Sequence, residues 1–543
     1  MVNISDDYNV NRAAFEAAAI KVPSGYLMPE VIENTSQNPT WVHFGGGNLF
    51  RCMQAVHSQT LLEKGLSNTG IILAETWDDG LIEGIYDQYQ NRTLDVILKS
   101  DGTYDLELID SVTEAHYVNA NDEKGKAGFM RMKEIFQNPS LQLATFTVTE
   151  KGYNIKDLQG QFFPPVAEEI EDGPENPVSL MGVVTALMLA RFEAGALPIA
   201  LVSTDNFSHN GDKLKASITQ IASAWQERGY VSAGFIAYLN DAQKVGFPYS
   251  MIDRITPAPS EDIASKLSEQ SISPVDILKT DKFSTSAAFV NTEETNYLVI
   301  EDNFPAGRPP LEEAGVIFTS REKVDEVERM KVCTCLNPLH TALAVTGCLL
   351  GFTKIWQGVG DDALLNLIRK IGYTEGMPVV TDPGIISPID FIDEVIKKRL
   401  PNPYIPDTPQ RIATDTSQKL PIRFGVTISL YKDSLHLDVK NLQAISFTLA
   451  AWLRYLLGVD DEGNAFERSP DPMFPELDPV FSTLKLGDNA SKLEVVKPFL
   501  KDSNIFGVDL EAAGLSEKVF KFFVRMAEKP GAVREVLEEV AFC

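Results

Sequence analysis

Cysteine is scarce in this chain, which has five among 543 residues, at positions 52, 333, 335, 348 and 543. A small secreted fold held by disulfides needs a dense, even set of cysteines, so this class is excluded and the cytoplasm is the expected location. Cys333 and Cys335 have no second Cys or Cys/His pair at the spacing of a zinc site. The sequence therefore predicts no structural zinc and no metal ligand.

Positive charge is also in short supply. The chain has 48 Lys and Arg against 76 Asp and Glu, a formal net charge of −28, and its sequence pI is about 4.7. A field of this sign repels the phosphate backbone of nucleic acids, which excludes them as expected partners.

Long apolar runs are missing as well. The most apolar stretch, Ala342 to Phe352, is about half of the ~20 residues needed to cross a bilayer. The N-terminus has no basic segment followed by an apolar one, so no signal peptide is predicted. With 44% hydrophobic and 23% charged residues, the composition is that of a soluble globular protein with no membrane partner.

The spacing of apolar residues changes near residue 325, which indicates two domains. Before it, strand-like segments at 41–47, 70–75, 93–99, 104–109, 141–149 and 198–203 alternate with helical patterns at 48–64 and 179–194. This alternation predicts a largely parallel sheet with its functional loops at the carboxyl ends of the strands. After it, helical patterns dominate, at 341–351, 361–371, 388–399, 442–457, 491–500 and 516–528. We therefore expect an α/β Rossmann-like nucleotide-binding domain over residues 1–325 and a mostly α-helical substrate and catalytic domain over residues 326–543.

The first strand runs into a glycine turn, Gly45-Gly46-Gly47, which a helix and a second strand follow. Glycines let the backbone approach a pyrophosphate, and the next helix presents free N–H groups to it. Phe50 or Arg51 stands where the third glycine of the common fingerprint would fall, so a plain tight turn is the alternative. The predicted cofactor-binding residues are Phe44, Gly45, Gly46, Gly47, Asn48, Leu49, Phe50, Arg51 and Glu75.

Glu75, at the end of the second strand, is a candidate acceptor for the adenosine ribose hydroxyls, which would favour NAD over NADP. Asp78 and Asp79 are rival candidates, and a solvated acid at a strand end is the structural alternative.

Two further segments carry polar residues that either a site or the fold could use. Asn206 and Asn210 follow a buried strand, and a carboxamide can donate to a developing alkoxide, although Asn is equally an ordinary turn former. Asp253 and Arg254 are adjacent within an apolar stretch, a pattern that taken alone indicates a structural ion pair.

The stretch from Lys331 to His340 places an amine, a carboxamide and an imidazole within ten residues. Lysine, asparagine and histidine together can take a proton, polarise an oxygen and orient an alcohol without a metal. Asn337 and His340 share a helical face, whereas Lys331 would point away from it in a continuous α-helix. We expect Asn337 to cap a helix that Pro338 begins, with Lys331 on a separate preceding segment. A capped helix with a surface lysine is the structural alternative.

Arg411, Lys419 and Arg423 place three cations within thirteen residues of a very acidic chain. This density indicates an anion site, with a charged loop surface as the alternative.

Together these segments resemble the mannitol dehydrogenase family of polyol-specific long-chain dehydrogenases and reductases. The matching pieces include His43 to Arg51, Val148 to Tyr153 and Ser203 to Gly211, then Ile252 to Pro257, Lys331 to His340 and Arg411 to Lys419. Asp253-Arg254-Ile255-Thr256-Pro257 is close to the family's signature. Two differences stand out: Asn337 comes six positions after Lys331, one position later than in the family, and Pro338 replaces a small residue. We interpret the difference as Lys331 approaching from a kink or a loop.

The resemblance implies NAD(P)-dependent, zinc-independent oxidation of a secondary alcohol. It implies Lys331 as the general base, Asn206 and Asn337 as holders of the reacting oxygen, and His340 as the residue that positions the substrate. It further implies Asp253 in the substrate pocket, and Arg411 and Lys419 near substrate and cofactor.

The basic segment favours a sugar acid as the small-molecule substrate, with the D-mannonate and D-fructuronate pair (a fructuronate reductase) as the leading expectation. Mannitol 2-dehydrogenase and tagaturonate reductase are the alternatives within the family, and a nucleotide-binding sensor without turnover is the alternative outside it. We expect a monomer or a small homo-oligomer.

Overall fold

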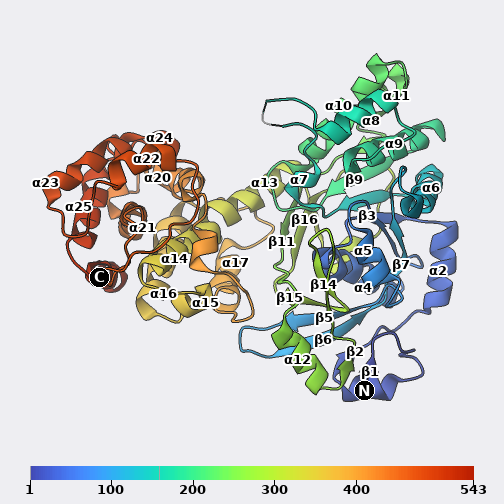
Figure 1. Ribbon diagram of the computed structural model, residues 1–543, viewed down its shortest axis with the longest axis horizontal. Coiled ribbons are helices and arrows are strands. Elements are labelled where there is room, and N and C mark those ends of the chain that lie inside the picture. Colours follow the sequence, from blue (N-terminus) through green and yellow to red (C-terminus); the bar gives the residue numbers. More distant parts are fainter. Residues whose placement is uncertain (1, 158) are drawn as a thin grey trace. The chain divides into compact units, whose positions relative to one another are not determined.

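The computed structural model describes residues 2–157 and 159–543, which divide into two compact units (Figure 1). The first comprises residues 2–99 and 103–325, and the second comprises residues 326–543 with the short segment Ser100–Gly102.

A six-stranded parallel sheet in the order β10-β9-β8-β3-β4-β7 forms the centre of the first unit. Its strands are β3 (Trp41–Phe44), β4 (Ile71–Glu75), β7 (Val112–Tyr117), β8 (Leu143–Phe146), β9 (Ile199–Ser203) and β10 (Val245–Gly246). Every residue of β3, β4, β8 and β9 is buried, as expected for a parallel sheet covered on both faces. Because β4 and β8 pair with opposite sides of β3, the strand order reverses there, and ligands bind at such switch points.

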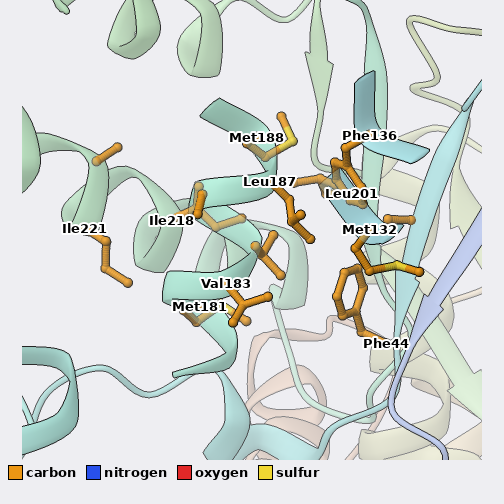
Figure 2. Close-up of a cluster of buried hydrophobic side chains, with 14 of the residues drawn as sticks. Phe44, Met132, Phe136, Met181, Val183, Leu187, Met188, Leu201, Ile218 and Ile221 are labelled. Carbon is orange, nitrogen blue, oxygen red and sulfur yellow. The ribbon is translucent and has the colours of Figure 1, made fainter. Parts of the chain in front are cut away.

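Helices α6 (Glu123–Gln137), α9 (Leu180–Glu193) and α10 (Asn210–Glu227) pack together in the main hydrophobic core. Figure 2 shows Leu187 of α9 between Ile218 of α10 and a group formed by Leu201, Phe44 and Phe136. The helix predicted over 48–64 is broken at Met53, which separates α3 (Asn48–Cys52) from α4 (Gln54–Glu63).

One expectation about the strands is wrong in part, because 93–99 and 104–109 do not join the parallel sheet. They form the antiparallel hairpin of β5 (Thr93–Leu98) and β6 (Tyr104–Ile109) in a separate sheet of order β15-β5-β6-β2. Period-two hydrophobicity identifies a strand but does not say which sheet it joins. The other strands of the unit are β1 (Val2–Asn3), β2 (Ile20–Lys21), β11 (Ser250–Asp253), β12 (Ile272–Ser273), β13 (Ile277–Lys279), β14 (Thr285–Ala287), β15 (Phe289–Glu293), β16 (Tyr297–Glu301) and β17 (Ile317–Thr319).

The remaining helices of this unit are short. They are α1 (Arg12–Ala17), α2 (Met28–Gln37), α5 (Asp79–Leu81), η1 (Ile82–Tyr86), α7 (Thr149–Gly152), α8 (Pro164–Asp172), α11 (Ala233–Asn240), α12 (Glu261–Glu269) and η2 (Leu311–Ala314), and α13 (Arg321–Met330) leads out of the unit.

All regular elements described in the second unit are helices. In its first half these are η3 (Lys331–Cys335), α14 (Asn337–Leu349), α15 (Ile355–Val359), α16 (Asp362–Arg369), η4 (Lys370–Gly376), η5 (Met377–Val379), α17 (Pro388–Glu394) and η6 (Val395–Arg399). There follow α18 (Pro409–Ile412), α19 (Thr416–Leu420), η7 (Pro421–Gly425), α20 (Val426–Asp433), η8 (Val439–Asn441), α21 (Gln443–Tyr455), α22 (Phe474–Phe481), α23 (Ala490–Leu493), η9 (Glu494–Lys501), α24 (Ser503–Phe506), α25 (Ser516–Met526) and α26 (Ala532–Phe542). The α14, α21 and α25 helices pack in sequence around the core of the unit.

A single helical span among the described residues, Arg321–Leu349, is long and apolar enough to cross a membrane. Its most apolar window is 78% buried inside the protein. A buried core helix of a globular unit has the same length and apolar composition.

Candidate active site

The glycine turn after β3 has a backbone that only glycine adopts readily. Gly45 has φ +105°, and a Cβ atom there would lie 2.3 Å from the carbonyl oxygen of Thr147 in the loop after β8. A Cβ on Gly47 would meet no protein atom within 4 Å, and Gly47 is exposed. The turn thus leaves its backbone open at the switch point of the sheet, which fits the close approach of a dinucleotide.

Glu75 at the end of β4 is buried and holds this turn from the side. Its Oε2 accepts the N–H of Gly46 at 2.7 Å, and its Oε1 accepts the N–H of Trp77 at 2.8 Å and of Asp78 at 3.2 Å. Burial raises the pKa of Glu75, and these three hydrogen bonds oppose the rise. Both carboxylate oxygens therefore already fix the loops at the predicted adenosine end.

The rival acids beside Glu75 also have partners. Asp78 is buried and accepts the hydroxyl of Thr280 at 2.6 Å, and Asp79 pairs with Lys124 at 2.8 Å.

The other residues of the predicted cofactor segment differ in how deeply they are buried. Asn48 and Leu49 are half-buried, whereas Phe44, Phe50 and Arg51 are buried. The Arg51 guanidinium donates to Thr93 Oγ1 at 2.9 Å, to Ser286 Oγ at 2.9 Å and to the carbonyl of Ala287 at 2.7 Å. These contacts bind α3 to the neighbouring sheets, so Arg51 supports the turn from inside the protein.

Asn206 and Asn210 after β9 have different surroundings. Asn210 is fully buried and its Nδ2 donates to the carbonyl of Asp205 at 3.1 Å and of Ser250 at 2.9 Å, which fastens α10 to β11. Asn206 has an exposed side chain beyond the carboxyl end of β9. Because β9, β8, β3 and β4 are neighbours, Asn206 and the glycine turn lie along one edge of the sheet.

Asp253 and Arg254 are both fixed at the end of β11. Arg254 is the structural member: its Nη2 lies 3.8 Å from Asp95, its Nε donates to Thr292 at 2.6 Å and its Nη1 to the carbonyl of Cys52 at 2.6 Å. Asp253 ends β11 and is buried.

In the second unit, Lys331 begins the π-helix η3. The N–H of Leu336 donates to the carbonyl of Lys331 at 3.1 Å, which closes a turn one residue longer than an α-turn. Such π-turns occur mostly singly and often at functional sites. The helix therefore accommodates the extra residue between Lys331 and Asn337 in a π-turn. The expected approach of Lys331 from a kink or a loop is wrong in this respect.

Asn337 is not the cap that the sequence predicts. Leu336 is the N-cap of α14, Asn337 is its first residue and Pro338 its second, where a missing N–H is harmless. Lys331 is 3% exposed, a burial that lysine rarely shows unless its amine has a partner. Asn337 and His340 are half-buried on α14.

Arg411, Lys419 and Arg423 lie on α18, α19 and η7 of the same unit. Arg423 Nη1 lies 3.4 Å from the carbonyl of Asn337 and donates to Thr341 Oγ1 at 2.5 Å. Lys419 donates to the carbonyls of Ile412 and Thr414, and burial together with the charge of Arg423 lowers its pKa to about 8. Arg423 thus adjoins the first turn of α14, and Lys419 lies close enough to Arg423 and Arg411 for their charges to lower its pKa.

Asp407 is a residue that the sequence analysis missed. It is buried in the proline-rich loop before α18; Oδ2 lies 3.3 Å from His340 Nε2, and Oδ1 pairs with Arg411. The only signal in the sequence was an acid four residues before Arg411. That spacing predicts an ion pair in a helix, but not in a proline-rich loop.

Comparisons with known proteins identify the family of the chain. The family model for the mannitol dehydrogenase Rossmann domain matches residues 39–313, and that for the mannitol dehydrogenase C-terminal domain matches residues 323–526. The fold and the matches define an oxidoreductase that uses a nicotinamide cofactor and acts on a small polyol or sugar acid. The chain belongs to the mannitol dehydrogenase family.

One relative and two solved structures are similar to the chain over nearly its whole length. The chain is 49% identical over 532 residues to a D-mannonate oxidoreductase of Thermotoga maritima, covering 98% of this chain and 97% of the relative. A D-sorbitol dehydrogenase in substrate-free form has the same fold, with a TM-score of 0.77 at 23% identity over 97% of this chain and 98% of the other. A Pseudomonas fluorescens mannitol 2-dehydrogenase, solved with NAD and D-mannitol, matches with a TM-score of 0.66 at 22% identity over 96% of each chain.

Proposed function

We propose that this enzyme interconverts D-mannonate and D-fructuronate, the alcohol and ketone of one sugar acid, with NAD as the hydride carrier. The observation that carries the choice of a sugar acid is a group of three neighbouring cations. Arg423 contacts the first turn of α14, and the charges of Arg423 and Arg411 both act on Lys419. A neutral hexitol offers no charge to pair with them, whereas a carboxylate accepts charge-assisted hydrogen bonds. The 49% identity to a D-mannonate oxidoreductase supports the same substrate.

In this proposal the amine of Lys331 takes the proton of the substrate hydroxyl during oxidation and returns it during reduction. Asn206 and Asn337 donate hydrogen bonds to the oxygen as it gains negative charge, without any change in their own charge. His340 and Asp253 orient the neighbouring hydroxyls. The nicotinamide, when bound, accepts the hydride from the carbinol carbon or supplies it to the ketone.

Preference for NAD over NADP is supported by Glu75 at the end of β4 and Asp78 just after it, because acidic groups there disfavour a 2′-phosphate. The assignment of Lys331 as the base, with Asn206 and Asn337 holding the oxygen, supports zinc-independent chemistry, because these side chains do what a Lewis-acid metal would otherwise do for the alcohol oxygen. The acidic composition and the scarcity of cysteine support a cytoplasmic location.

The alternative hypothesis, a nucleotide-binding sensor without turnover, depended on the altered spacing between Lys331 and Asn337. The π-turn of η3 accommodates the additional residue inside the helix, and this removes the reason to prefer a sensor.

An absorbance screen tests the proposal. Reduced nicotinamide is followed with D-mannonate, D-fructuronate, D-mannitol, D-fructose, D-altronate and D-tagaturonate, each with NAD or NADP in the appropriate redox state. We expect the highest kcat/KM for the D-mannonate and D-fructuronate pair with NAD. A higher value for a hexitol would replace the sugar acid, and no turnover with any pair would favour the sensor.

Arg411→Ala tests the role of the cations. Loss of a charge-assisted hydrogen bond of about 1.5–3 kcal/mol should raise the KM for D-mannonate by roughly 10- to 100-fold and change the KM or inhibition constant of D-mannitol by less than about threefold. Arg369→Ala, on the exposed side of α16, is the matched control. Equal losses for both compounds would remove the argument for a carboxylate.

A further inference from the structure

We propose that Asp407 is a positioning residue that holds His340 as its Nε2–H tautomer, so that Nδ1 is the hydrogen-bond acceptor offered to a substrate hydroxyl. The inference rests on the proposed function, in which His340 contacts the substrate. It adds a residue that acts through His340 and has no contact of its own with the reacting atoms.

The geometry around Asp407 carries this inference. Its Oδ2 lies 3.3 Å from Nε2 of His340, close enough for an ion pair although not aligned as a hydrogen bond. Catalytic hydrogen bonds are often long in a ligand-free protein and tighten when substrate binds. An acid at one imidazole nitrogen fixes the proton there and leaves the other nitrogen as an acceptor.

The position of Asp407 is itself fixed. Its carbonyl accepts the N–H of Ile355 at 3.0 Å, and Thr408, the next residue, caps α18 by accepting the N–H of Arg411 at 3.1 Å. The Asp407 side chain is 8% exposed, and its Oδ1 pairs with Arg411. A buried carboxylate with two partners has little freedom to turn away from His340.

The charges around the pair favour a neutral imidazole beside an ionised carboxylate. Burial lowers the pKa of His340, Asp407 opposes this change, and the charges of Arg423 on η7 and Arg399 on η6 reinforce it. Burial would raise the pKa of Asp407, but its contact with His340 and the charge of Arg411 hold it below its usual value. His340 therefore works as a neutral ring, and a neutral ring needs its tautomer set.

A double-mutant cycle tests whether Asp407 acts through His340. Asp407→Asn is nearly isosteric, yet its amide can donate to Nε2 and so stabilise the opposite tautomer. We expect kcat for D-mannonate oxidation to fall at least tenfold in otherwise wild-type enzyme and less than twofold in the His340→Ala background. The KM for D-mannonate should not rise, because Arg411 loses a competing carboxylate. Asp407→Glu should recover part of kcat, and Asp390→Asn, on the exposed side of α17, should leave it unchanged.

The possible outcomes separate the inference from the proposed function. If Asp407→Asn lowers kcat equally in both backgrounds, Asp407 has a structural role and the inference is wrong. If His340→Ala alone leaves kcat unchanged, the assignment of His340 fails. Melting temperatures are measured for every variant. Should Asp407→Asn melt more than a few degrees below the wild type, Asp407→Ser replaces it in the same cycle, with the same expected difference between backgrounds.

Discussion

At the scale of single residues, the proposed chemistry depends on polar groups held in low-exposure positions. Lys331 is 3% exposed, and Arg423 ties η7 to the carbonyl of Asn337 and the hydroxyl of Thr341. Groups fixed in this way need little reorganisation when charge develops on a substrate oxygen, which is the main electrostatic contribution of an enzyme site.

We expect Lys419 to give a pH dependence to substrate binding. Because its pKa is lowered to about 8, its ammonium is charged below that pH and neutral above it. The KM for D-mannonate should therefore rise as the pH passes from 7 to 9, whereas the inhibition constant of an uncharged hexitol should not follow it. Lys419→Arg keeps its charge throughout this range and should flatten the rise. The same rise in the Arg variant would exclude Lys419 as its source.

At the scale of elements, the sequence predicted most helices and the glycine turn but not how the functional helix is wound. The apolar spacing of residues 321–349 is compatible with a continuous helix or with a break at Asn337-Pro338. The structure instead has a π-turn, which the hydrogen bond from Leu336 N–H to the Lys331 carbonyl closes. Asp407 was missed for a related reason: a proline-rich loop gives no periodicity from which to place a side chain. Likewise, Glu75 was identified at the correct strand end, but its three backbone donors come from turns whose shape no spacing reveals.

The helix α21 begins on a buried acid from another element, which predicts a stability effect. Glu375 of η4 accepts the N–H of Ala444 at 2.7 Å and of Ile445 at 2.8 Å, while burial raises its pKa from 4.5 to about 7. Between these pH values the unfolded chain has lost the proton and the folded chain has kept it. Folding stability therefore falls as the pH rises through this window, by up to about 3 kcal/mol from this group.

Glu375→Gln should remove this pH dependence. We expect the variant to be less stable than the wild type at pH 5, because an amide accepts through only one oxygen, and the difference to shrink or reverse by pH 8. Urea titrations at the two pH values measure the free energy of unfolding. Glu538→Gln, exposed on α26, is the control. A difference that stays constant with pH would show that Glu375 is ionised throughout.

At the scale of the whole molecule, the chain joins a nucleotide-binding unit to a helical unit, each with its own core and part of the proposed chemistry. The glycine turn, Asn206 and Asp253 belong to the first unit, and Lys331, Asn337 and His340 belong to the second. The net charge of −28 repels an anionic substrate at long range, so the local cations of the second unit must supply its attraction at short range.

The central claim is that Lys331 is the base of an alcohol dehydrogenation. The most direct measurement is the pH profile of kcat for NAD reduction by D-mannonate, compared between wild type, Lys331→Ala and Lys432→Ala, an exposed lysine on α20. We expect Lys331→Ala to lower kcat by roughly 10²- to 10⁴-fold and to abolish the limb of the profile in which the wild type gains activity as the base loses its proton. Lys432→Ala should match the wild type. Near-normal turnover in Lys331→Ala with an unchanged pH profile would contradict the account.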